Sequence, residues 1–504
     1  MPAPVLRDKV EKWVLFFTIV LSVSAWVISY RLHYVLTYND AASHLNIARR
    51  VVDNLTPGLA QIGTVWLPLP HLLMLVFAWN DFFWHTAMAG SIVSMVSFVI
   101  CVLFTYKLIF FLSKNPLAAW LGTMVMALNP NFLYLQTTPM TEPLLLATFA
   151  FSSYYLARYI EDNKLGHLIL TGVGVMAASL TRYDGWFLFV VLLILLPVWG
   201  YLTQGRKKAE RVLLLFLFVG GFGIFLWLIW NLAIFGNPLY FLLGPYSAFA
   251  QQRVLKTVGQ LPTEGNLPLA IVYYFWSIVD NNGFFTLIFA LAGLMFVILK
   301  LKNKQQLVTI VAVLSPLVFN ILALYFGQSA MNVPQAEKDA GLFNIRYGLL
   351  VLPSLALIIG LIGAYSRKYL LLVIVLLIQT VIFYQQGVPV VLADGINGLK
   401  NTYYTVEASA WLSQNYDGGL ILTSLASHDA FVARAGLPMK NYIHEGTRYY
   451  WTNALKDPGR YVRYIAVLEF PPDSVYRAIY KNSSFTKNFT AIHSYEQFTI
   501  YQHK

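Results

Sequence analysis

Long apolar runs recur along this chain, and they restrict the folds that it can adopt more than any other feature. Most have about 17–25 residues, the length that a helix needs to cross a hydrocarbon core roughly 30 Å thick. Hydrophobic residues make up 58% of the 504 residues, and charged residues only 12%. The sequence therefore predicts a polytopic α-helical membrane protein. We expect about eleven transmembrane helices, near residues 13–30, 86–106, 116–129, 143–159, 166–181, 186–200, 212–234, 283–299, 307–326, 347–364 and 369–386.

The basic residues predict how these helices are oriented. The formal net charge is +12, but Lys and Arg lie in short loops beside apolar runs, so nucleic acid is not an expected partner. Basic loops stay in the cytoplasm. This rule places inside the loops that contain residues 107–114, 158–164, 206–211, 300–304 and 367–368. It places outside the less basic segments 31–85, 130–142, 182–185, 235–282, 327–346 and 387–504.

The hydropathy falls after Gly387, and this change predicts two domains. Residues 1–386 should form the membrane domain, whose first external loop, 31–85, carries amphipathic helices. Residues 387–504 should form a small extracytoplasmic α/β domain. Its composition predicts helices in 407–415 and 474–482, and strands in 419–424, 463–470 and 497–502.

The first external loop gathers polar residues in the stretch "TYNDAASHLNIARRVVDNLTP". Apolar residues at helical spacing predict an amphipathic helix along the membrane surface, with Asn39 as its cap and an end before Pro57. Asp40 and His44, four residues apart, lie on one flank of its apolar stripe. An Asp in the first turn also stabilises a helix electrostatically, and His44 could simply be solvated.

Three later external segments bring further charges. Glu142 stands where the fourth span begins, and a carboxylate there is costly without a partner or water, although it could also cap the helix. Arg182 and Asp184 lie in the turn "TRYDG", where a local ion pair would explain them equally well.

Arg346 enters the tenth span from the outside, against the positive-inside trend. A guanidinium there needs an anionic partner, which is either a ligand or Asp339 or Glu337 of the same loop. Charged residues that lie at the depth of the membrane face indicate binding of a lipid phosphate. Carboxylates beside such a phosphate indicate base-assisted group transfer.

In this layout the chain resembles the GT-C superfamily of integral-membrane glycosyltransferases. This superfamily includes protein O-mannosyltransferases, lipid A aminoarabinose transferases and oligosaccharyltransferase catalytic subunits. The resemblance rests on the order and spacing of short motifs over residues 1–386, namely "YNDAASH", "MTEP", "TRYDGW", "FGNPLYF" and "NIRYGLLVLP". It implies an inverting enzyme in the plasma (inner) membrane, with its active site and C-terminal domain on the extracytoplasmic side. This enzyme would move a sugar from a polyprenyl-phosphate carrier to a lipid, glycan or protein acceptor.

The resemblance also implies roles for particular residues. Asp40 matches the catalytic acid of the first loop, which would act as general base on the acceptor hydroxyl. Glu142 matches the acid of the second loop, which positions the acceptor or joins a metal site. Arg346 and Arg182 would bind the phosphate of the sugar donor through charge-assisted hydrogen bonds. The supporting candidates are His44, Arg50, His71 and Asp184.

Two matters stay open at this stage. Asp40, Glu142 and His44 could hold a divalent metal such as Mg or Mn, but oxygen and nitrogen ligands of unknown geometry identify no ion. A transporter or flippase of a lipid-linked glycan is the main alternative function. Such a protein would need ionisable groups deep in its spans, and often inverted repeats. The chain instead gathers its charges at one membrane face and has no visible repeat.

Overall fold

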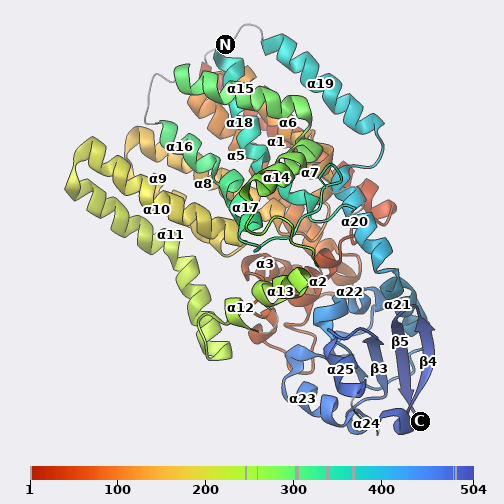
Figure 1. Ribbon diagram of the computed structural model, residues 1–504. Helices are drawn as coiled ribbons and strands as arrows, with labels where there is room; N and C mark the ends of the chain where they lie inside the picture. The colour runs from red at the N-terminus through yellow and green to blue at the C-terminus, as the bar shows by residue number, and fades with distance from the viewer. Residues whose placement is uncertain are drawn as a thin grey trace. The chain divides into compact units, whose positions relative to one another are not determined.

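The computed structural model describes residues 3–244, 247–257, 259–300, 306–336, 341–365, 369–480, 482 and 485–504. The chain divides into two compact units (Figure 1). The helical unit comprises Met1–Tyr34, Thr64–Leu69 and Ser91–Asp394, and the mixed unit comprises Val35–Gly63, Pro70–Gly90 and Gly395–Lys504.

The helical unit contains most of the expected spans. Its longer helices are α1 (Ala3–Arg31), α5 (Met88–Ser113), α6 (Pro116–Ala127), α8 (Glu142–Asp162), α9 (Leu165–Ser179), α10 (Tyr183–Gln204), α11 (Arg206–Phe235), α14 (Leu267–Asn282), α15 (Phe284–Lys300), α17 (Ser315–Tyr325), α18 (Leu352–Tyr365) and α19 (Tyr369–Gln385). Shorter elements are α7 (Pro130–Leu135), α12 (Tyr240–Leu243), α13 (Ala248–Thr257), α16 (Gln306–Val313) and the 3₁₀ helix η2 (Ile345–Val351). Helix α20 (Val390–Asn401) begins in this unit and ends in the other.

The lengths of these helices confirm a membrane-spanning protein. Within the described residues, seven helices are long and apolar enough to cross a membrane, or eight if the bent pair α14–α15 counts as one span. Helices α6 and α9 are apolar but shorter. The expected count of eleven is therefore not confirmed. The polar turn "TRYDG" does separate two helices as predicted, since α9 ends at Ser179 and α10 begins at Tyr183.

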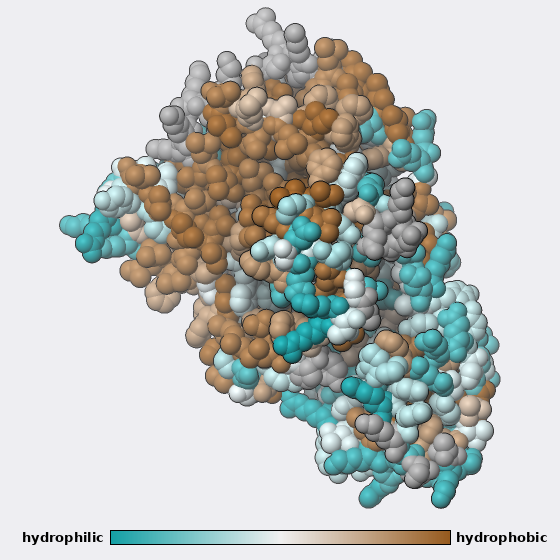
Figure 2. All heavy atoms as spheres, viewed as in Figure 1, coloured by the Kyte–Doolittle hydropathy of each residue, from teal (hydrophilic) through white to brown (hydrophobic). Residues whose placement is uncertain are grey.

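Helices α9, α10 and α11 pack side by side and expose apolar side chains (Figures 1 and 2). Figure 2 shows hydrophobic side chains over these helices. Ile194 of α10 and Phe218 of α11 are 60% and 73% exposed. A surface of this kind is stable only when lipid or protein covers it. Figure 2 also shows a hydrophilic end to this group of helices. Arg206, the first residue of α11, is exposed.

The segment 235–282, which we expect outside, contains more helical structure than a loop. It contains α12, α13 and α14, and the chain bends by 112° between α14 and α15. Gly283 occupies the bend with φ +87°, and an added Cβ there would lie 2.3 Å from the side chain of Gln379. Glycine alone fits that conformation and that spacing.

Labelling of single cysteines tests the predicted orientation. Cys101 is fully buried, so a Lys207→Cys variant reports its own reactivity with a membrane-impermeant maleimide. We expect no labelling at position 207 in intact cells, and labelling at Ser413→Cys, an exposed position of the expected outer segment. Labelling of position 207 from outside would refute the orientation. The predicted inner loop 300–304 lies largely outside the described residues.

The mixed unit contains a five-stranded sheet in the order β2-β1-β3-β5-β4 (Figure 1). Its strands are β1 (Ile421–Leu422), β2 (Tyr442–Ile443), β3 (Tyr464–Leu468), β4 (Phe489–Tyr495) and β5 (Phe498–His503). Strand β1 is parallel to β2 and β3, whereas β5 is antiparallel to β3 and β4. The helices are α2 (Asn39–Arg49), η1 (Leu59–Ile62), α3 (Leu69–Ala78), α4 (Asp81–His85), α21 (Tyr403–Asn415), α22 (Leu425–Ala435), η3 (Met439–Asn441), η4 (Glu445–Thr447), α23 (Tyr449–Lys456), α24 (Pro458–Tyr461), α25 (Ser474–Tyr480) and α26 (Phe485–Asn488).

The mixed unit combines segments that are far apart in the sequence, and the predicted boundary between two domains near residue 386 stays a prediction. Most of the first external loop groups with residues 395–504 rather than with the spans. Buried polar contacts explain this grouping. The Asp53 carboxylate accepts hydrogen bonds from the backbone N–H groups of Met439 at 3.1 Å and Lys440 at 3.2 Å. Asn54 and His444 are also hydrogen-bonded, at 3.0 Å.

Helix α2 also differs from its prediction in three ways. It ends at Arg49, well before Pro57, and it is buried on most sides instead of presenting one polar face to solvent. Asn39 is not its cap, because Tyr38 holds that position without a side-chain bond. Asn39 instead donates to Thr402 and accepts from Arg434, which ties the start of α2 to the C-terminal segment.

Candidate functional site

Three of the predicted residues meet in the helical unit around one buried carboxylate. Glu142 is the first residue of α8 and is completely buried. Its Oε1 accepts a hydrogen bond from Arg182 Nη1 at 3.1 Å and another from Arg346 Nε at 3.0 Å. Such charge-assisted bonds offset the large cost of burying these charges. Glu142 is therefore an ion-pair partner of both arginines as well as a first-turn residue.

The position of Arg346 is fixed by polar contacts between η2 and α14. The carbonyl of Ile345 accepts hydrogen bonds from Ser277 Oγ at 2.8 Å and from Asn281 Nδ2 at 2.6 Å. The two backbones approach closely, since an added Cβ on Gly348 would lie 2.2 Å from the carbonyl oxygen of Ser277. Arg346 is thus presented by a rigid backbone. Its alternative partners, Asp339 and Glu337, lie outside the described residues.

A tight turn between α9 and α10 holds Arg182 and Asp184. Arg182 Nε donates to Asp184 Oδ2 at 3.1 Å, which is the local ion pair considered from the sequence. This local pair is not the only interaction of Arg182, because its guanidinium also donates to Glu142 and to Thr141 Oγ1. Gly185 permits the turn, since an added Cβ there would lie 2.2 Å from the backbone of Ala178.

An aromatic ring completes this group. The guanidinium carbons of Arg182 and Arg346 each lie 5.1 Å from the centre of the Tyr347 ring. Such cation–π contacts orient guanidinium groups. Sequence reasoning did not assign a role to Tyr347, although the motif "NIRYG" contains it.

Two carboxylate oxygens in this group keep unused hydrogen-bonding capacity. Glu142 Oε2 and Asp184 Oδ1 are buried and accept no hydrogen bond from any residue that the structure describes. A buried acceptor without a donor is costly. These oxygens can therefore accept a hydrogen bond from a hydroxyl or amine, while the guanidinium groups can stabilise negative charge.

The predicted first-loop residues lie in the mixed unit. Asp40 is half-buried in the first turn of α2. His44 and His71 are both buried, and His44 Nδ1 lies 2.9 Å from His71 Nε2. His44 is therefore not simply solvated. Because Asp40 and His44 are one helical turn apart, the imidazole pair begins beside the candidate base.

Arg50, the remaining candidate of the first loop, is half-buried and lies among C-terminal acids that the sequence did not single out. Its Nε donates a hydrogen bond to the carbonyl of Gln61 at 2.5 Å. Asp429 and Glu445 both act on it electrostatically, although burial is the larger influence and lowers its pKa. Asp429 is buried and accepts a hydrogen bond from Asn46 Nδ2 at 2.6 Å.

Burial raises the pKa of Asp429 to about 7, against the opposing influences of Arg50 and Asn46. Because its pKa in the unfolded chain is about 3.9, the folded protein loses stability as the pH rises from about 4 to about 7. Asp429→Asn preserves size and removes this titration. We expect the melting temperature of the variant, relative to wild type, to be higher at pH 8 than at pH 5. An equal difference at the two pH values would contradict this assignment.

Metal binding is not established by these side chains. Among the residues that the structure describes, no group of three or more His, Cys, Asp or Glu side chains could hold a metal ion. Asp40 and His44 belong to the mixed unit and Glu142 to the helical unit, so a metal site shared by these three stays a prediction.

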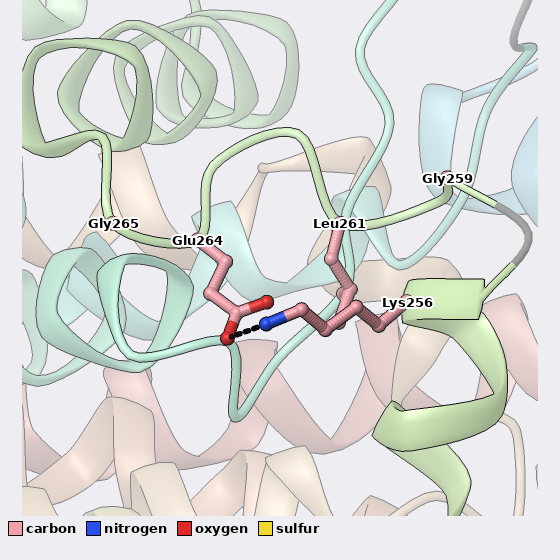
Figure 3. Close-up of a pocket in the computed structure, with 5 residues that line it drawn as sticks. All are labelled: Lys256, Gly259, Leu261, Glu264 and Gly265. Atoms are coloured by element: carbon pink, nitrogen blue, oxygen red, sulfur yellow. Dashed lines mark hydrogen bonds and ion pairs between the residues drawn. The ribbon is translucent and has the colours of Figure 1, made fainter.

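An open pocket between α13 and α14 contains none of the predicted residues (Figure 3). It is lined by Lys256, Gly259, Leu261, Glu264 and Gly265. Lys256 Nζ and Glu264 Oε1 form an ion pair of 2.8 Å across it. Lys256 is mostly exposed, so this pair contributes little to stability.

Comparison with known proteins identifies the fold. The sequence model of the dolichyl-phosphate-mannose-protein mannosyltransferase family matches residues 76–235, which is less than half of the chain. The structure resembles ArnT from Cupriavidus metallidurans bound to undecaprenyl phosphate, with a TM-score of 0.57 and 10% identity over 97% of this chain and 98% of that one. It also resembles the apo oligosaccharyltransferase of Archaeoglobus fulgidus, with a TM-score of 0.50 and 11% identity over 91% of this chain and 70% of that one. No curated protein sequence matches the chain.

These similarities show that the chain shares the fold of ArnT and of the archaeal oligosaccharyltransferase, which confirms the predicted class of a polytopic helical membrane protein with a small C-terminal domain. The chain is an integral membrane protein with a small C-terminal sheet. The matched family segment begins after Asp40 and includes Glu142, Arg182 and Asp184.

Proposed function

We propose that this protein is an inverting glycosyltransferase that moves a sugar from a polyprenyl-phosphate carrier to an extracytoplasmic acceptor. The observation that most supports this proposal is the buried group in which Arg182 and Arg346 converge on Glu142. The fold supports it as well, because ArnT, which has this fold, is known bound to undecaprenyl phosphate. We place the protein in the plasma membrane, and the distribution of basic residues favours an active site outside the cytoplasm.

In this mechanism each charged group has a separate role. Asp40 accepts the proton of the acceptor hydroxyl as it attacks the anomeric carbon, and the bond from that carbon to the phosphate oxygen breaks. Arg346 and Arg182 stabilise the negative charge that the leaving polyprenyl phosphate gains. Glu142 Oε2, which is buried without a donor among the described residues, accepts a hydrogen bond from the acceptor, or would serve as a ligand if a divalent metal is bound.

Incubation of the purified protein with a polyprenyl-phosphate-linked sugar and an envelope extract tests this proposal. We expect free polyprenyl phosphate to appear together with a glycosylated product whose anomeric configuration is inverted. A flippase would move the donor across vesicles without cleaving it. Transbilayer movement without cleavage would therefore replace the proposed function with the alternative.

Glu142→Gln should impair both transfer and stability, because the side chain keeps its size but loses the charge that both arginines share. Breaking a buried ion pair typically costs about 3–5 kcal/mol. Glu264→Gln, which removes a partly exposed ion pair of the same unit, is the matched control and should leave transfer unchanged. Transfer rates per folded molecule at wild-type level in Glu142→Gln would exclude the role.

Exhaustive chelation of the wild-type protein then separates the two versions of this role. Loss of transfer that Mg or Mn restores would support a metal at Glu142. Unchanged transfer would support the version in which Glu142 positions the acceptor directly.

A further inference from the structure

Arg50 differs from the arginines around Glu142 in one important respect. Its guanidinium forms no ion pair with any residue that the structure describes, and its one hydrogen bond there is the bond from Nε to Gln61. A guanidinium has five N–H donors, so most of its donors are available to another molecule. The side chain is half-buried and therefore remains reachable from solvent.

The Gly63 backbone lies close beside the Arg50 guanidinium. Gly63 has φ +78°, and an added Cβ on it would lie 3.2 Å from Arg50 Nη2. A side chain at position 63 would crowd the guanidinium from this direction. Glycine therefore serves two purposes, since it adopts the positive φ and allows the guanidinium to approach the backbone closely.

The two carboxylates near Arg50 are held by other partners. Glu445 accepts hydrogen bonds from Ser424 Oγ at 2.5 Å and from the N–H of Leu425 at 3.0 Å, at the start of α22. Asp429 accepts from Asn46. Both attract Arg50 electrostatically, yet neither forms an ion pair with it. The three charged groups thus stay apart instead of neutralising one another.

A break in α22 positions Asp429. His428 has non-helical backbone angles, φ −153° and ψ 49°, and its Nε2 lies 2.7 Å from Thr423 Oγ1. After this break, both the carbonyl and the carboxylate of Asp429 accept hydrogen bonds from Asn46, at 3.0 Å and 2.6 Å. Two elements far apart in sequence, α2 and α22, are thereby joined next to Arg50.

The charges of this cluster select the chemistry of its ligand. Two carboxylates repel an anion, and a guanidinium repels a cation. A sugar hydroxyl both donates and accepts hydrogen bonds, so it suits all three groups at once. We infer that Arg50, Asp429 and Glu445 form a binding site for a neutral, hydroxyl-bearing sugar residue. The raised pKa of Asp429 is consistent with this site, because a carboxyl that is partly protonated near neutral pH can also donate.

The sugar would come from the donor or from the acceptor, and this assignment rests on the proposed function. Saturation-transfer NMR on the full-length protein in nanodiscs tests the site without requiring sugar transfer. It measures binding of four free sugars: D-glucose, D-mannose, L-arabinose and N-acetylglucosamine. We expect saturable binding of at least one sugar. Because a hydrogen bond to a charged group contributes about 1.5–3 kcal/mol, Arg50→Gln and Asp429→Asn should each weaken binding by about tenfold or more.

Two further variants make the result interpretable. Glu445→Gln keeps the shape of the side chain and should weaken binding if the protein remains folded by its melting curve. Lys440→Gln removes an exposed cation of the same unit and should leave binding unchanged. Binding of none of the four sugars, or equal binding by wild type, Arg50→Gln and Asp429→Asn, would overturn the inference. Displacement of the sugar by inorganic phosphate would also overturn it, in favour of an anion site.

Competition identifies the source of the sugar. If a polyprenyl-phosphate-linked sugar displaces the free sugar, the site holds the donor's sugar; if both bind together, it holds the acceptor's. Release of polyprenyl phosphate, measured on the same preparations, separates this inference from the proposed function. Release without sugar binding at Arg50 refutes the inference alone. Sugar binding at Arg50 without release refutes the proposed function and leaves the sugar site in place.

Discussion

Replacing Asp40 with Asn is expected to lower the rate of sugar transfer by about 10²–10⁴, the usual contribution of a general base. Asn preserves the size and polarity of the side chain but cannot accept the proton of the acceptor hydroxyl. Asp40 lies in the first turn of α2 and is half-buried, so it is held in place yet remains reachable. The rate is measured as polyprenyl phosphate released per folded molecule.

The control for this variant is Asp417→Asn, which removes an exposed carboxylate paired with Arg463 in the same unit. Surface ion pairs contribute little, so this control should transfer sugar at the wild-type rate. Donor binding should be nearly unchanged in Asp40→Asn, because the residue acts on the acceptor. Transfer by Asp40→Asn at the wild-type rate would exclude Asp40 as the base and would favour a role in stabilising the helix.

Replacing Arg346 with Ala is expected to abolish nearly all transfer and to weaken donor binding, whereas Arg346→Lys should keep partial activity. Lys preserves the charge but lacks the planar fork that binds a phosphate through two bonds. The leaving phosphate gains charge in the transition state, so the effect should appear in turnover as well as in affinity. The Ala variant should still fold, because Arg182 remains as a partner of Glu142.

The competing explanation is that Arg346 serves only to neutralise Glu142. In that case Arg346→Ala would lower the melting temperature while each folded molecule bound polyprenyl phosphate as tightly as wild type. Arg253→Ala, which removes an exposed cation of the same unit, controls for non-specific loss of charge. Donor affinity in the folded variants therefore decides between the two roles.

Parts of the fold could be predicted because local patterns determine them. The apolar runs identify most of the long helices, and "TRYDG" correctly separates α9 from α10. Helix α14 was missed because the chain bends sharply at Gly283, directly after it. Its apolar run was therefore assigned to an external loop between two spans. The strands β2 and β4 were missed because a strand of two residues, and an edge strand with an irregular register, leave weak patterns.

The candidate site was predictable only residue by residue. Position and charge sufficed to select Glu142, Arg182 and Arg346, but the sharing of one carboxylate oxygen by both arginines depends on contacts across more than two hundred residues. Asp429 and Glu445 carry no local signal, since acids in a soluble α/β segment are ordinary. Their significance comes from the packing of α2 against α22.

The grouping of the first loop with the C-terminal segment could not be predicted for a similar reason. Helix α2 has a pattern of apolar residues that suits a membrane surface, and a protein surface can cover the same residues equally well. Polar residues in and after the helix decide the matter, because Asn46 of α2 and Asp53 beyond its end are buried and hydrogen-bonded to the C-terminal segment. Hydropathy alone treats those residues as solvent-exposed.

Mass analysis of envelope glycans from cells that express equal amounts of wild-type protein or Asp40→Asn tests the central claim most directly. Transfer from a polyprenyl-phosphate carrier predicts that one glycosyl unit is missing from an envelope lipid, glycan or protein in the variant cells, and that the lipid-linked sugar accumulates. Identical glycans in both cell types, with no accumulated lipid-linked sugar, would contradict the claim that this protein is a glycosyltransferase.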